Sequence, residues 1–199
     1  RAAMAPVIPT TTGSAVLIDC GANAECTPEY LLQFAYLGSY YAQRVMGIEK
    51  PRVGLLNIGA EEEKGDTLRH EAFALLKEAG DAGRICFIGN VEANDAMLGA
   101  ADVIVTDGFT GNVILKLTEG LGSMFSKKIK GMFTGVSGKL AGALMLKKVK
   151  GFKKSMDYTE YGGAPLLGIT KPVIKAHGSS NAKAIKNAIR QARDFAQSD

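Results

Sequence analysis

The turn DGFTGN, which begins at Asp107, combines residue types that suit an anion-binding site. Gly108 and Gly111 would allow backbone amides to approach a ligand closely, while Thr110 and Asn112 offer uncharged hydrogen bonds. Unpaired amides at a helix N-terminus attract phosphate groups, because they carry the positive end of the helix dipole. The same residues are equally compatible with a tight strand-to-helix connection in which the aspartate caps the helix.

A second turn with suitable composition is HGSSN, which begins at His177. An apolar run ends there, Gly178 follows, and Ser179 and Ser180 place two hydroxyls at the expected start of a helix. This arrangement predicts a seat for a phosphate group. Alternatively, one of the serines only caps the last helix and the imidazole packs beneath it.

The third turn is GAEEEKGD at residues 59–66, in which Lys64 is the one cation among four carboxylates. A compact ammonium group there could reach the ends of the neighbouring strands and bind a phosphate or a developing oxyanion. The alternative interpretation is a solvated acidic turn with no chemical task.

The sequence demands neither a covalent nucleophile nor a metal. It contains no Ser-His-Asp order, HExxH, CxxC or P-loop motif. Cys20, Cys26 and Cys86 have spacings that match neither a redox pair nor a zinc ribbon, so we interpret them as ordinary buried or half-buried thiols. These features favour a reaction driven by positioning and electrostatics.

The elements that must position these turns alternate along the chain. Apolar runs predict strands, and 3.6-residue patterns with N-terminal caps predict helices between them. The expected strands are residues 15–19, 52–58, 85–88, 103–106 and 172–176, and the expected helices begin at residues 27, 67, 93, about 113 and 182. Continuous apolar strands alternating with helices are typical of a parallel sheet covered on both faces. The sequence therefore predicts a single α/β domain over residues 1–199, a three-layer structure with an open, mostly parallel sheet.

Length and composition agree with one globular domain. The chain has 199 residues, of which 46% are hydrophobic. No run of about 18 apolar residues occurs, and residues 1–12 do not form a signal peptide, so we expect a cytosolic protein. The same twelve residues resemble the approach to a strand more than the start of a domain, which indicates a segment missing upstream.

A basic segment interrupts an otherwise acidic chain. Residues 124–155 hold nine lysines and no acid. Helical patterns at residues 121–133 and 140–150, separated by a Gly-containing turn, predict a helical hairpin. Its second half carries the apolar and basic residues Leu140, Leu144, Met145, Val149, Lys139 and Lys147.

Two interpretations of this hairpin stay open. Its apolar sides could join the core or a dimer contact, with the lysines in solvent. It could instead bind to anionic lipid headgroups, in which case each lysine near the membrane surface would add about 1 kcal/mol to the binding free energy. Nucleic-acid binding has no support, because the segment lacks an aromatic stacking platform and a recognition helix.

Long motifs resemble one known family. Residues 89–120 (GNVEANDAMLGAADVIVTDGFTGNVILKLTEG) and residues 161–189 (YGGAPLLGITKPVIKAHGSSNAKAIKNAI) are similar to the phosphate acyltransferases of bacterial phospholipid synthesis. The segments IDCGANAECTPEYLLQFAYLGSYYA and NIGAEEEKGD resemble the same family, so the similarity covers essentially the whole chain. Members of that family begin with a further α/β segment carrying a DAMGGD motif, which this chain lacks.

The resemblance implies a function. Family members transfer a long-chain fatty acyl group from acyl carrier protein to inorganic phosphate, without a cofactor, on a fold similar to isocitrate dehydrogenase and phosphotransacetylase. They are homodimers, lie in the cytoplasm, contact the inner face of the cell membrane through a hairpin corresponding to residues 121–156, and supply acyl phosphate to a glycerol-phosphate acyltransferase.

The resemblance also assigns roles to the three turns. It implies that Lys64 and Asn112 take part in the reaction. The residues it places along the phosphate or phosphopantetheine end of the cleft are Asp107, Gly108, Thr110, Gly111, His177, Gly178, Ser179 and Ser180.

Two other functions remain as alternatives. The chain could be a non-catalytic, membrane-associated binding fragment, which would bind lipid without forming acyl phosphate. It could also be a phosphotransacetylase-like or dehydrogenase-like enzyme of the same fold, although the sequence offers no clustered aspartates for a divalent metal and no GxGxxG motif.

Overall fold

A five-stranded sheet forms the centre of the computed structural model, which describes residues 1–134, 142, 144–145, 147–148, 151, 162–178 and 180–197. In sheet order its strands are β2 (Val7–Thr10), β3 (Gly13–Ile18), β6 (Val103–Val105), β4 (Arg52–Leu56) and β5 (Cys86–Val91). The last four are mutually parallel, and β2 turns back antiparallel to β3. The carboxyl ends of the parallel strands therefore meet along one edge.

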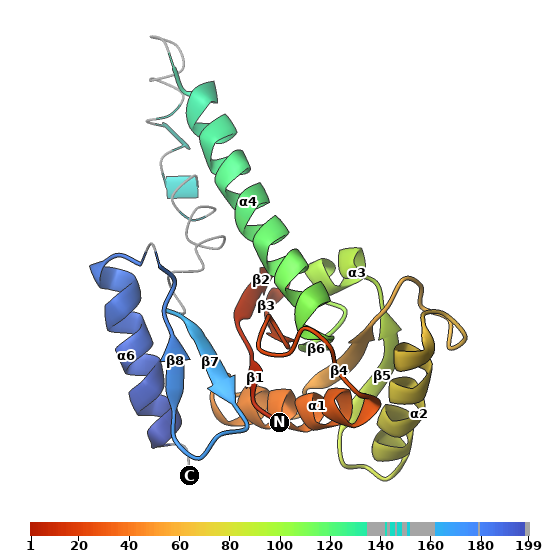
Figure 1. Ribbon diagram of the computed structural model, residues 1–199. Helices are drawn as coiled ribbons and strands as arrows, with labels where there is room; N and C mark the ends of the chain where they lie inside the picture. Colours follow the sequence, from red (N-terminus) through yellow and green to blue (C-terminus); the bar gives the residue numbers. More distant parts are fainter. Residues whose placement is uncertain are drawn as a thin grey trace.

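Helices cover both faces of this sheet. Helices α1 (Pro28–Arg44) and α2 (Thr67–Asp81) lie on one face, and α3 (Ala93–Leu98) and the start of α4 (Gly108–Met132) lie on the other (Figure 1). Alternate strand residues supply the two cores, because successive side chains point to opposite faces of a sheet. Gly38 lets α1 approach closely: a Cβ there would lie 2.5 Å from Val103.

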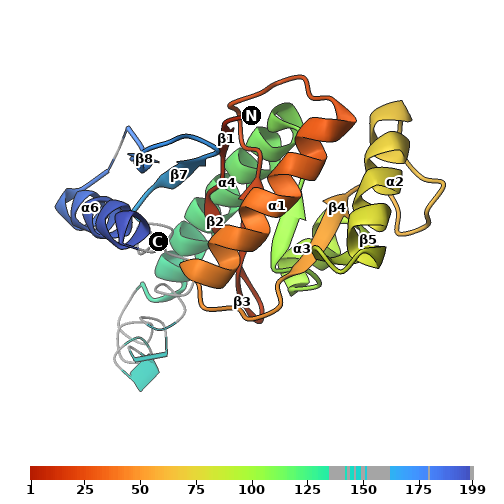
Figure 2. The same ribbon diagram turned by 90° about the horizontal axis from the view of Figure 1, so that it is seen from below.

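A second, antiparallel sheet lies beside the first and is formed by β1 (Ala3–Met4), β7 (Ala164–Leu167) and β8 (Val173–Lys175). We call it the small sheet. Helix α6 (Ala182–Ala196) packs against it, and Gln191 Nε2 donates to Tyr41 Oη of α1 at 2.6 Å. Seen from below, the small sheet and α6 lie on the opposite side of α1 from α2 (Figure 2).

The expected alternation of strands and helices is confirmed, with four differences. Residues 1–12, expected as the approach to a strand, contain the strands β1 and β2. Helix α4 begins at Gly108, not at about residue 113, because the Asp107 side chain caps it. The strand expected at 172–176 belongs to the antiparallel small sheet, and its partner β7 was not expected from the sequence. Strand β5 continues beyond residue 88 through Gly89, whose φ of 92° accommodates an irregularity in the pairing with β4.

Candidate active site

The turn after β3 is held by the buried carboxylate of Asp19. Its two oxygens accept from the backbone amides of Met4 at 2.8 Å, Ala22 at 3.2 Å and Asn23 at 2.6 Å, and from Asn23 Nδ2 at 2.9 Å. Asn23 Nδ2 also donates to Ala2 O at 2.8 Å. Asp19 thus joins the central sheet to the segment that forms β1, and it fixes the shape of residues 19–23. No motif in the sequence pointed to this aspartate.

The start of α4 packs directly onto that turn. The amide of Gly108 donates to Asn23 O at 2.8 Å, and a Cβ at Gly108 would lie 2.3 Å from the same oxygen. A Cβ at Gly111 would lie 1.9 Å from Asp19 O. We expected these glycines to admit a ligand; in the structure they admit the chain's own backbone, and the Gly108 amide already has an acceptor.

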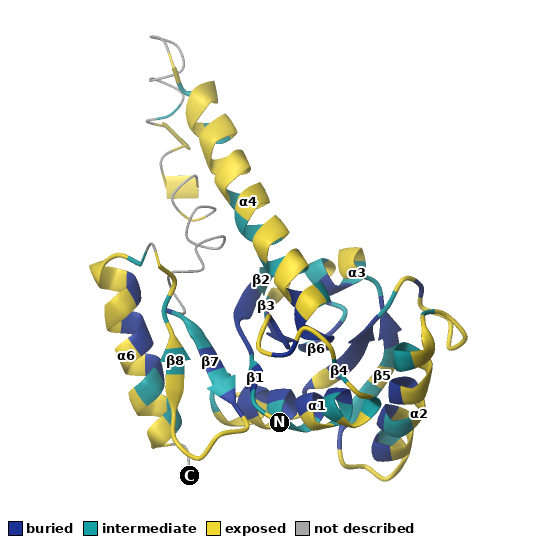
Figure 3. Cartoon of the chain, in the orientation of Figure 1, coloured by how far each residue is buried: buried dark blue, intermediate teal, exposed yellow. Residues whose placement is uncertain are grey.

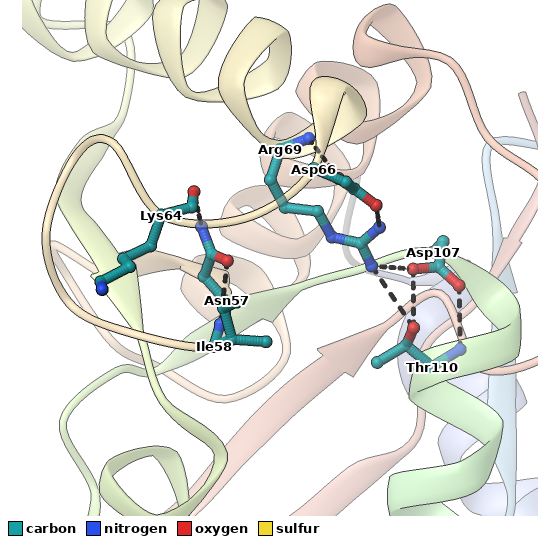
Figure 4. A network of polar contacts seen from close by, with 7 residues as sticks. All are labelled: Asn57, Ile58, Lys64, Asp66, Arg69, Asp107 and Thr110. Atoms are coloured by element: carbon teal, nitrogen blue, oxygen red, sulfur yellow. Dashed lines mark hydrogen bonds and ion pairs between the residues drawn. The ribbon is translucent and has the colours of Figure 1, made fainter.

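Asp107 caps α4 and pairs with Arg69 of α2 (Figure 4). It accepts from the Thr110 amide and the Thr110 hydroxyl, each at 2.8 Å, and from Arg69 Nη2. Burial alone would raise the pKa of Asp107, but the Thr110 hydrogen bonds and the charge of Arg69 outweigh it and lower that pKa below its ordinary value. Arg69 also donates to Asp66 at 2.9 Å, so one guanidinium links the N-termini of α2 and α4.

Lys64, the cation of the 59–66 turn, does not take part in this network. Arg69, which does, lies outside that turn. The Lys64 carbonyl accepts from Asn57 Nδ2 at 2.9 Å, which shapes the loop after β4. Its side chain is exposed and points away from the Asp107–Arg69 pair (Figure 4). Lys64 therefore lies on the correct edge of the sheet, but not beside Asn112.

A pocket of about 560 Å³ lies between α4, β2 and the small sheet, and it brings two of the predicted turns together. Asn112 lines one wall; His177 and Ser180 line another, together with Lys175 of β8. Lys116 also lines the pocket but pairs with Glu119 at 3.1 Å. Among the described residues, Lys175 forms no ion pair, so it leaves a positive charge in a pocket that the Asn112 amide and the His177 imidazole also line.

The pocket walls are set by local geometry. Asn112 lies one helical turn after Gly108, and its side chain is adjacent to Gly21, where a Cβ would lie 3.6 Å from the Asn112 side chain. The Ser180 amide donates to the His177 carbonyl at 3.0 Å. The cap of α6 is Asn181, which accepts from the Ala184 amide at 3.0 Å, so Ser180 does not cap the helix.

The remaining residues of the two turns are placed as follows. Thr110 contributes its hydroxyl to Asp107 and does not line the pocket. His177 is exposed, so it does not pack beneath the helix, and Gly178 is exposed beside it. Ser179 lies outside the described residues.

The cysteines near the strand ends are poor nucleophiles. Burial, aided by the Asp19 carboxylate, raises the pKa of Cys20 far above its ordinary value. Burial also raises the pKa of Cys26, beside the start of α4. Both thiols are therefore protonated at neutral pH, and only a thiolate attacks efficiently. Cys86 lies at the opposite, amino end of β5.

The described part of the chain contains no cluster of three or more His, Cys, Asp or Glu side chains that could hold a metal. Within the same residues, no helix is both long and apolar enough to span a bilayer. The first half of the expected hairpin is the distal part of α4. In its second half, Leu144, Met145 and Lys147 are exposed, whereas Leu140, Val149 and Lys139 lie outside the described residues.

Comparison with known proteins supports one family. A family model described as "Fatty acid synthesis protein" matches residues 1–199. A phosphate acyltransferase from Thermoanaerobacter pseudethanolicus is 52% identical over 200 residues, which cover 100% of this chain and 59% of the relative. One from Alkaliphilus oremlandii is 57% identical over 196 residues, covering 98% of this chain and 57% of the relative. The chain thus spans less than two thirds of these relatives.

Solved structures agree on the fold. The EutD phosphotransacetylase from Staphylococcus aureus superimposes with a TM-score of 0.65 at 15% identity, covering 98% of this chain and 54% of that chain. A branched-chain phosphotransacylase from Enterococcus faecalis gives a TM-score of 0.60 at 15% identity, covering 97% and 64%. At this identity the similarity establishes a phosphotransacetylase-like fold.

Proposed function

The chain belongs to the fatty acid synthesis protein family, and on that premise we propose that it transfers a long-chain fatty acyl group from acyl carrier protein to inorganic phosphate. The observation that carries the proposal is the pocket that Asn112, Lys175 and His177 line together. It offers an amide donor from α4 and a cation from β8, which suit a reaction between an anion and a carbonyl.

In the proposed reaction, a phosphate oxygen attacks the thioester carbonyl carbon. The new C–O bond forms, negative charge develops on the carbonyl oxygen, and Asn112 donates a hydrogen bond to that oxyanion. The C–S bond then breaks, and the departing sulfur takes up the proton of hydrogen phosphate. Lys175 holds the attacking phosphate by charge. No acyl-enzyme is needed, in agreement with the raised pKa of Cys20 and Cys26.

The other residues have supporting parts in this proposal. Asp107, Thr110 and the two glycines of the first turn fix the start of α4, and so the position of Asn112. His177 and Ser180 line the pocket, and we assign them to the phosphate or the phosphopantetheine. The same assignment for Gly178 and Ser179 rests on the family resemblance. Lys64 lies on a separate exposed loop in which the carboxylates outnumber it, so its proposed part in the reaction rests on the family resemblance.

The proposal extends to the cellular setting. The lysine-rich segment at residues 121–156 contacts anionic lipid, a role that the exposed apolar side chains of Leu144 and Met145 support. The enzyme acts as a homodimer in the cytoplasm, at the inner face of the membrane, and its acyl phosphate is consumed by a glycerol-phosphate acyltransferase. It needs neither metal nor cofactor.

The direct test is to incubate the purified chain with palmitoyl acyl carrier protein and phosphate, and to measure acyl phosphate as its hydroxamate. We expect product that depends on phosphate and is lost in a Lys175→Gln variant. A folded chain that forms no product would contradict the proposal that this pocket is sufficient for the reaction.

A further inference from the structure

The C-terminal part of the chain carries a concentrated positive charge. Residues 171–193 contain six basic residues and no acidic one. All six are exposed: Lys171, Lys175, Lys183, Lys186, Arg190 and Arg193. Four of them lie on α6. Arg193 pairs with the next residue of α6, Asp194, at 2.6 Å, but the segment keeps a net positive charge. A positively charged surface attracts a partner of opposite charge and accelerates its association.

Helix α6 has exposed positions along its length, drawn yellow in Figure 3, and two of them carry large apolar side chains. Its buried positions include the small residues Ala184 and Ala188, whereas the larger Ile185 is 43% exposed and Ile189 is 67% exposed. The two isoleucines are one helical turn apart, so they form a single patch. Removing exposed isoleucine side chains from water is favourable, so a partner that covered this patch would gain affinity.

The patch lies next to the pocket. Asn181 and Ala184, at the start of α6, line the pocket, and Lys175 lines the pocket from β8. A helix rises about 1.5 Å per residue, so Ile189 lies only about 7.5 Å further along the axis than Ala184. An extended phosphopantetheine arm is longer than this, so a carrier seated on α6 could deliver its thioester to the pocket.

We propose that the outer face of α6, defined by Ile185, Lys186, Ile189 and Arg190, is the docking surface for the acidic acyl carrier protein. This inference rests on the proposed function and names the face through which its acyl donor arrives. The two isoleucines are the apolar anchors and the surrounding cations supply charge complementarity. The short patch beside a pocket that accepts a thioester favours a carrier protein over a lipid surface.

The test compares two acyl donors in a Lys186→Glu, Ile189→Asp double variant. Both side chains are exposed, so the fold is retained. We expect the KM for palmitoyl acyl carrier protein to rise at least about tenfold, whereas kcat/KM for palmitoyl-pantetheine, which has no carrier, stays unchanged. The matched control is Lys50→Glu, an exposed lysine between α1 and β4.

The outcomes separate this inference from the function on which it rests. An unchanged KM for the carrier, or an equal loss with both donors, would overturn the docking surface but leave the reaction intact. A wild-type chain that uses neither donor would contradict the proposed function. In that case the docking surface is tested by the binding of labelled holo-acyl carrier protein. We expect the double variant to bind it about tenfold more weakly than wild type, and equal binding would contradict the inference.

Two further measurements test other occupants of the same face. If the double variant lost binding to anionic vesicles while still binding the carrier, the face would be a membrane contact. If it changed the sedimentation of the chain alone, the face would join two copies. Either result would overturn the proposal.

Discussion

The hydrogen-bond network of Asp19, Asp107 and Arg69, which we call the strand-end network, lies near the pocket lined by Asn112 and Lys175. The two regions use polar residues in opposite ways. In the network, Asp19 and Asp107 are buried, and each accepts several hydrogen bonds from within the chain. In the pocket, Asn112, Lys175 and His177 are exposed and line the same cavity. Buried charges with complete sets of partners hold a shape, whereas exposed groups can exchange water for a ligand. The comparison teaches that proximity to a Gly-rich turn does not distinguish the two roles.

The largest expected effect comes from breaking the network at Asp19. Asp19→Asn replaces one acceptor oxygen with an amide group, which leaves two buried donors without an acceptor. Each unsatisfied donor costs about 1–3 kcal/mol, so urea unfolding should show a loss of roughly 2–6 kcal/mol. The exposed Asp81→Asn serves as control and should change stability by less than about 0.5 kcal/mol. Equal stability of the two variants would contradict the structural role of Asp19.

Asn112→Ala should lower the catalytic rate without lowering the stability of the fold. Loss of one oxyanion donor costs about 2.7–4 kcal/mol of barrier, so turnover should fall roughly a hundred- to a thousandfold while the unfolding free energy stays the same. The hydroxamate assay and urea unfolding measure the two effects, and Asn94→Ala, an exposed asparagine on α3, is the control. Near-normal turnover would remove Asn112 from the mechanism.

A smaller effect, with a pH signature, is expected at Asp107. Its pKa in the folded chain is below the ordinary value of 3.8, so its contribution to stability is fully present above about pH 5 and is lost as the pH falls through the lowered pKa. Asp107→Asn should therefore lower stability by about 1.5–3 kcal/mol at pH 7, and the difference from wild type should shrink below about pH 4. A difference that stays constant from pH 7 to pH 2 would exclude the charged pair with Arg69.

The sequence predicted the elements better than the contacts. Strands such as β3 and β6 are short apolar runs bounded by turns, and Asp107 stands where a cap is expected, so local pattern sufficed. It did not suffice for Arg69, which contacts an aspartate 38 residues away. Nor could it place Lys175 in the same pocket as Asn112, because that depends on β8 joining the small sheet through β7, a strand whose internal proline hides its pattern.

The most direct measurement is the affinity of the chain for inorganic phosphate, determined by isothermal titration calorimetry for wild type, Lys175→Gln and Lys64→Gln. Because hydrogen bonds to charged groups contribute about 1.5–3 kcal/mol, we predict that Lys175→Gln raises the Kd roughly 10- to 100-fold. Lys64→Gln, on its separate loop, should change it by less than about threefold. Undiminished binding by Lys175→Gln, with binding lost in Lys64→Gln, would contradict the account and place the phosphate on the loop after β4.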